Sequence, residues 1–206
     1  MSALFVSAFV TFLVVIDPPG CAPIFASLTS GTSAAHRRAT AFRSVGIASG
    51  ILLFFGLLGQ PLLHALGVSL TAFRIAGGIL LFLIAIDMVF EKRTERREDR
   101  AEEVAKEKPE DISVFPMAIP MIAGPGSIAS IMLQMSRSEG WGEFLIVWAA
   151  LGATLILTLL CLLLAGPLMR LLVNKMEAMI TRLLGVILAA LAVQFVIDGI
   201  RRSFFA

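Results

Sequence analysis

The chain has 206 residues, of which 58% are hydrophobic and 16% are charged, and its formal net charge is only +2. Its mean hydropathy is +0.91, whereas a soluble domain is usually about 45–50% apolar. The composition therefore excludes an ordinary soluble domain, and the small net charge gives no reason to expect a nucleic-acid partner.

The first half of the chain contains three apolar segments, each able to cross about 30 Å of hydrocarbon as a helix. The first runs from Ala3 to Ile16, stops at Asp17-Pro18-Pro19-Gly20, and resumes over residues 21–28. The second and third are expected at residues 45–63 and 73–90. The apolar runs are continuous rather than alternating, so they predict helices and not the strands of a barrel.

The second half repeats this pattern after a charged interval. Residues 91–111 are almost wholly charged, with both signs interleaved, which is typical of a solvated linker. The fourth apolar segment begins near Val114, breaks at Gly124-Pro125-Gly126 and continues from Ser127, and two further segments follow at residues 144–165 and 179–197. The expected fold class is an all-α polytopic membrane protein with six transmembrane helices, of which the first and fourth are broken by Pro and Gly.

The distribution of Lys and Arg predicts the orientation of these helices, because cytoplasmic loops carry an excess of both. Thirteen of the 17 basic residues lie near the loops that follow the first, third and fifth segments. The other four are Arg74, Arg137, Arg201 and Arg202. The expectation is a multi-pass membrane protein with both termini extracytoplasmic.

An internal repeat relates the two halves. Pro19-Gly20 recurs 106 residues later as Pro125-Gly126, and Pro61-Leu62 recurs at the same offset as Pro167-Leu168. The start of the third segment, from Arg74, resembles the start of the sixth, from Arg182, at an offset of 108. Three spans are an odd number, so the second copy would enter the membrane from the opposite face. This predicts a 3+3 inverted-topology repeat of residues 1–90 and 112–206, joined by a cytoplasmic linker at residues 91–111.

Interrupted helices at matching places in two repeats are typical of a transporter's binding site. A helix that begins after a break presents N–H groups at the positive end of its dipole, which favours an anion such as a carboxylate. Asp17 would attract a cation, a proton or an ammonium group, so the two breaks together suit a zwitterion. The alternative is a kink that serves packing alone. The expected substrate-binding residues are Asp17, Pro19, Gly20, Cys21, Gly124, Pro125, Gly126 and Ser127.

A few other polar side chains lie within or beside the apolar segments. Gln134 and Gln194 lie deep enough either to line a polar cavity or to bridge helices. Asp198 has the spacing of an ion pair with an arginine one helical turn later. Arg74 and Arg182 hold matching places in the repeat and are expected to reach the headgroups.

Two motifs suggest a family. Residues 17–25, Asp-Pro-Pro-Gly-Cys-Ala-Pro-Ile-Phe, resemble the signature Asn-Pro-x-Gly-x-x-Pro-x-Phe of the MarC family of bacterial inner-membrane proteins. Residues 122–128 contain the Ala-Gly-Pro-Gly motif of the same family. The resemblance covers essentially the whole chain and departs from the signature at Asp17, where Asn is commoner. It implies six spans, a location in the bacterial plasma (inner) membrane and, for some members, transport of small neutral amino acids such as alanine and glycine.

The favoured function is a secondary transporter of small neutral amino acids or similar metabolites, working by alternating access with no cofactor. A coupled proton or cation, the lipid bilayer and a second copy of the chain are the expected partners besides the substrate. A channel or a membrane scaffold is the alternative. An intramembrane enzyme is less favoured, because Ser127 has no obvious histidine partner and neither a nucleotide-binding loop nor a metal motif is present. Cys21 and Cys161 lie in apolar context and predict neither a disulfide nor a metal site.

Overall fold

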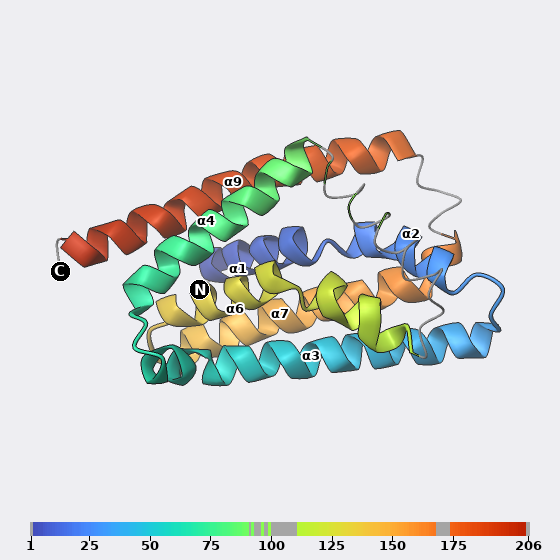
Figure 1. Ribbon diagram of the computed structural model, residues 1–206, viewed down its shortest axis with the longest axis horizontal. Coiled ribbons are helices and arrows are strands. Elements are labelled where there is room, and N and C mark those ends of the chain that lie inside the picture. Colours follow the sequence, from blue (N-terminus) through green and yellow to red (C-terminus); the bar gives the residue numbers. More distant parts are fainter. Residues whose placement is uncertain are drawn as a thin grey trace.

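The computed structural model describes residues 2–90, 92, 96, 99, 111–167 and 174–204, and in this part of the chain all the regular structure is helical (Figure 1). Most of the charged segment 91–111, and Leu168 of the internal repeat, lie outside the described residues. The helices, in chain order, are α1 (Ser2–Ile16), α2 (Pro18–Leu28), α3 (Ala34–Ala65), α4 (Leu70–Val89), η1 (Ser113–Ile122), α6 (Pro125–Arg137), α7 (Gly140–Leu163) and α9 (Asn174–Phe204).

By length and hydropathy, five stretches in the described part of the chain can each cross a membrane, and η1 with α6, bent by 51° at their junction, counts as a sixth where this bent pair is taken as one span. The protein is therefore an all-helical, multi-pass membrane protein. The second span is longer than its apolar part suggests. Ser33 caps α3 by accepting a hydrogen bond from the His36 N–H at 3.2 Å, so the helix begins at Ala34 rather than near Val45.

The helices run alternately up and down the bundle, so α1 begins and α9 ends at the same end, on the left of Figure 1. We call this the terminal end, and it also holds the turns between α3 and α4 and between α6 and α7. The opposite end is the linker end, where α2 ends, η1 begins and α9 begins.

The buried side chains form two clusters that divide the bundle into two parts. The larger cluster joins α1, α2, α3, η1, α6 and α7, which we call the body. The smaller one joins α4 and α9 to each other and to one side of α1 and α6, through residues such as Val14, Leu133 and Phe195. We call the α4–α9 pair the arm, and it lies along the top of Figure 1.

Candidate functional site

The first break is a single residue, Asp17, between α1 and α2. Its φ of 58° and ψ of 66° place it in the left-handed region, which most L-residues avoid but which Asp and Asn tolerate. Asp17 is buried, with only 6% of its surface exposed. The chain therefore changes direction at a residue type suited to this backbone, and the Asn of the family signature has the same tolerance.

The start of α2 is capped from within the chain. Pro18 and Pro19 occupy its first two positions and have no N–H to donate. The first donor is the Gly20 N–H, which bonds the Asp17 Oδ1 at 3.2 Å, and the Cys21 N–H bonds the Asp17 carbonyl at 3.1 Å. The helix thus begins at Pro18, three residues before the expected start, and the N–H groups expected to bind a ligand here are already bonded to Asp17.

The second break has a different construction. Phe115 and Ile119 adopt extended backbone angles inside η1, as residues that precede Pro116 and Pro120 are constrained to do. At the end of η1 the chain passes through Gly124, where a Cβ atom would overlap the Pro120 carbonyl oxygen. This close approach of two backbone segments requires glycine.

The start of α6 has no side-chain cap. Gly124 is its N-cap residue, Pro125 holds the first position, and the first intrahelical bond runs from the Ile128 N–H to the Gly124 carbonyl at 3.0 Å. Gly126 and Ser127 carry the two remaining donors, and within the described residues neither N–H has a hydrogen-bond partner. Of the two breaks, this one offers donors and positive dipole potential to an anion.

The two breaks meet inside the bundle. A Cβ atom built on Gly126 would lie 3.2 Å from Val15, two residues before Asp17, and 2.5 Å from Ile84 of the arm. On the terminal side of this meeting point, the Gln134 side chain of α6 donates to the Thr11 hydroxyl of α1 at 3.3 Å. The structure therefore brings together residues from both halves of the chain that the sequence places more than a hundred residues apart.

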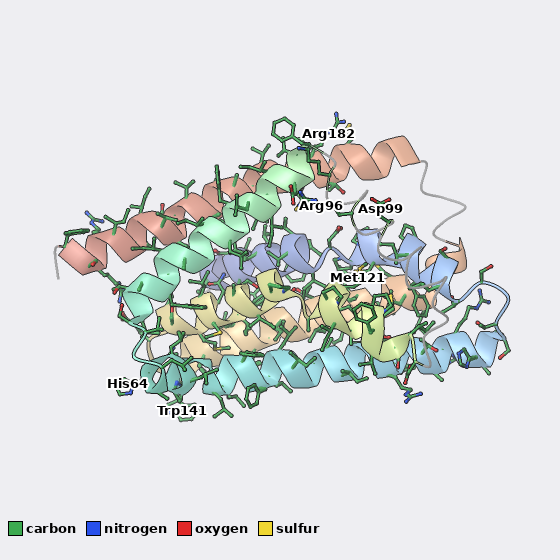
Figure 2. The ribbon with its side chains drawn as sticks, in the orientation of Figure 1. His64, Arg96, Asp99, Met121, Trp141 and Arg182 are labelled. Carbon is green, nitrogen blue, oxygen red and sulfur yellow. The ribbon has the colours of Figure 1, made fainter. Side chains whose placement is uncertain are left out.

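Exposure at the breaks is confined to a few of the expected site residues. Pro125 is exposed and Pro19 and Gly20 are partly exposed, whereas Gly124 and Gly126 are buried. Cys21 is wholly buried, and its thiol is directed at the Ile16 carbonyl, 3.5 Å away. Figure 2 shows the side chains that fill the bundle around this region, with Met121 of η1 labelled on the linker side of the break.

Two cavities lie away from the breaks, one near each end of the body. One of 180 Å³, at the linker end, lies among α2, α3 and α7 and includes Thr29, Arg38 and Pro167. Another of 460 Å³, at the terminal end, lies among α3, α6 and α7 and includes Pro61, Met135 and Phe144. Nine residues line the second cavity, and for seven of them the residue 106 positions away in the sequence lines the first cavity.

The remaining polar residues take places that the sequence only partly suggests. Gln134 is 2% exposed and bridges α6 to α1, which is the bridging alternative of the two considered. Gln194 donates to Asp198 at 2.7 Å within α9. Asp198 forms its ion pair with Arg137 of α6, not with the arginine that follows it in α9.

Arg74 is the largest departure from expectation. It is 3% exposed, and instead of reaching the headgroups it donates from Nε to the Ser136 hydroxyl at 3.0 Å and from a second nitrogen to the Ser136 carbonyl. Sequence spacing could not reveal this contact, because Arg74 and Ser136 lie on different halves of the chain. The available signal was the cost of an arginine inside a membrane span, which predicts a partner without naming it.

Comparison with known proteins places these features in a family. The profile of the MarC family, described as integral membrane proteins, matches residues 2–204. A UPF0056 membrane protein of Methanocaldococcus jannaschii is 38% identical over 197 residues, which is 96% of both chains. The UPF0056 membrane protein YvbG of Bacillus subtilis is 33% identical, over 99% of this chain and 97% of its own.

A third relative, the UPF0056 membrane protein YhcE of Escherichia coli, is 34% identical over 95% of this chain and 91% of its own. The relatives thus come from archaea as well as bacteria. No solved structure matches the chain. The matched span and these identities show that the chain belongs to the MarC family of integral membrane proteins.

Proposed function

We propose that this protein is a secondary transporter of small neutral amino acids or closely similar zwitterions, and that the substrate binds where the two broken spans meet. The observation that carries the proposal is the meeting of the α6 N-terminus with the Asp17 break. The uncapped Gly126 and Ser127 N–H groups would hold the substrate carboxylate. The Asp17 carboxylate, which can accept more than one hydrogen bond, would hold the ammonium group or a coupled proton or cation.

The proposed architecture is the 3+3 inverted-topology repeat, with the termini extracytoplasmic and the linker end cytoplasmic, in the inner membrane of a bacterial host. The packing supports it, because η1 and α6 pack on α3 while α1 and α2 pack on α7, as exchange of the two halves requires. The two cavities lined by corresponding residues support it independently. A repeat of this kind has two nearly equivalent packings, which is the physical basis of alternating access.

The test is flux of radiolabelled alanine and glycine into liposomes that contain the purified protein, with and without an imposed proton gradient. We expect saturable flux, in contrast to a channel, whose flux does not saturate at modest concentration. Absence of flux under every gradient would remove these amino acids as substrates.

A variant series locates the site. Gly126→Val should abolish flux, but because Gly126 touches Ile84, the same variant also crowds the arm. Adding Ile84→Ala relieves the crowding, so flux that stays absent in the double variant points to the blocked N–H groups, and flux that returns points to packing alone. Gly152→Val is the matched control, since nothing lies within 4 Å of that position.

A further inference from the structure

Arginine contacts join the arm to the body at the terminal end. Arg74, in the first turns of α4, holds the hydroxyl and carbonyl of Ser136 near the end of α6. Arg137, the last residue of α6, pairs with Asp198 of α9 and lies 4.1 Å from the centre of the Phe195 ring. The C-terminal end of α6 is thus held by both helices of the arm. We call these two contacts the latch.

Burying the charged Arg74 side chain costs free energy unless its donors are paired, so the latch requires specific partners. Arg74 is buried, and hydrogen bonds from an arginine to a helix-end carbonyl satisfy an acceptor that the helix itself leaves unpaired. The Gln194 amide also donates to Asp198 at 2.7 Å, which fixes the carboxylate toward Arg137. Side chains from α4, α6 and α9 therefore converge on one small region.

In the described part of the linker end, the structure shows no contact between the residues that correspond to Arg74 and Ser136. By the repeat, Arg74 corresponds to Arg182 of α9, and Ser136 corresponds to Ser30, just after α2. Both Arg182 and Ser30 are exposed, and Figure 2 labels Arg182 where the end of α4 crosses α9. In the part of the chain that the structure describes, α2 packs on α7 and η1 but has no comparable packing against α9.

The two ends of the bundle are therefore unequal although the sequence repeat makes them equivalent. Within the described residues, the contacts that join the arm to the body extend from the terminal end to the level of the breaks, where Ile84 meets Gly126. Exchanging the conformations of the two halves would bring the start of α9 to the end of α2 and would separate α4 from α6.

We infer that the latch, Arg74–Ser136 and Arg137–Asp198, is the gate that closes the terminal side of the transport site, and that this structure is the state in which it is closed. In the opposite state the latch is broken and Arg182 approaches the end of α2 near Ser30. This inference rests on the proposed transport function and adds the residues that control access to its site.

The experiment uses a buried reporter and needs no substrate. Val14 is wholly buried where α1 meets the arm, and a Val14→Cys variant preserves its approximate size. A membrane-impermeant maleimide is added from the side on which the termini lie, and labelling above that of the unsubstituted chain measures opening. We expect Arg74→Ala, Arg137→Ala and Asp198→Asn each to raise the labelling rate about tenfold or more, the shift that loss of one charge-assisted bond produces.

Two matched controls separate a gate from general loosening. Arg43→Ala removes an ion pair of the same kind at the linker end, where Arg43 lies 2.9 Å from Asp111, and should leave labelling unchanged. Arg182→Ala removes the repeat counterpart of Arg74, and the labelling rate of this variant should be unchanged or reduced. Equal increases in the latch variants and in either control would overturn the gate.

Two further comparisons distinguish opening of the gate from a folding defect and from the transport function. Arg74→Lys retains a donor for the Ser136 carbonyl and should label far more slowly than Arg74→Ala, and the near-isosteric Asp198→Asn decides the matter if an alanine variant does not fold. Unchanged labelling in all folded latch variants overturns the gate even where alanine flux is seen. Opening in those variants without any amino-acid flux would retain the gate and reject the proposed substrates.

Discussion

Asp17 combines a left-handed backbone with a carboxylate that caps the next helix, and both depend on a short polar side chain. The sequence predicted the break from its Pro and Gly residues, and it singled out Asp17 for its charge. The Asp17 carboxylate bonds the Gly20 N–H of its own chain, a cap that Asp followed by Pro at a helix start signals and that the interpretation from charge alone missed. The second break has no side-chain cap, and the close approach of Gly124 to the Pro120 carbonyl there could be seen only in the folded chain.

A pair of substitutions at Asp17 distinguishes its geometry from its charge. Asp17→Ala should lower stability by about 2–3 kcal/mol, because loss of a cap costs about 0.5–2 kcal/mol and alanine tolerates the left-handed region poorly. Asp17→Asn keeps both features and should retain most of the stability. The measurement is the apparent melting temperature in detergent, and an equal loss in both variants would show that the charge itself is what stabilises the fold.

Alanine and glycine flux in the Asp17→Asn variant then tests the charge alone. If Asp17 carries a coupled proton or the substrate ammonium, flux should fall at least about tenfold, which corresponds to about 1.4 kcal/mol of lost interaction, although the fold is kept. Unchanged flux, with an unchanged response to a proton gradient, would reduce the role of Asp17 to that of a cap.

Among the elements, the α4–α9 pair depends on glycine. A Cβ atom at Gly78 would lie 2.9 Å from the Ala192 carbonyl and 2.7 Å from Val196, and one at Gly199 would lie 3.2 Å from the Thr71 carbonyl. Small residues allow two membrane helices to approach closely in this way. The apolar runs predicted that both helices exist. That α4 and α9 pack against each other could be seen only in the structure.

Gly78→Leu should separate the two helices of the arm. Backbone atoms stand in the way, so the added side chain cannot be accommodated by a rotamer change, and overpacking of this kind costs about 1–3 kcal/mol. At about 2–4 °C per kcal/mol for a chain of this size, the apparent melting temperature should fall by several degrees. Gly46→Leu is the matched control, because that glycine of α3 has nothing within 4 Å, and an equal fall in both variants would contradict the account.

At the scale of the whole molecule, the all-helical, membrane-spanning character of the chain could be read from hydropathy, and the places where the chain changes direction could be read from Pro and Gly. The helix ends could not, because caps such as Ser33 extend helices beyond their apolar parts. The division into body and arm could not be predicted either, because it arises from contacts between residues that no local sequence pattern connects. The repeat predicts two equivalent ends, whereas the described residues make different contacts at the two ends.

Orientation in the membrane can be tested with two exposed positions, Ser203 near the end of α9 and Asp99 in the charged segment. A Ser203→Cys variant should react with an impermeant maleimide in intact cells, and an Asp99→Cys variant should react only after the membrane is permeabilised. The reverse pattern would invert the proposed orientation, and labelling of both positions from the same side would contradict an odd number of spans between Asp99 and Ser203.

Under the proposed transport mechanism, the attachment of the arm at one end makes the lipid environment part of that mechanism. The outer face of the arm is apolar, with Leu83, Val186 and Val193 exposed, and any change in its tilt alters the hydrophobic length that it presents to the acyl chains. Mismatch costs fractions of a kcal/mol per Å, which is comparable with the small free-energy differences that separate transporter states. Membrane thickness would then set the resting balance between the two conformations, and the same protein would open to different degrees in thin and thick bilayers.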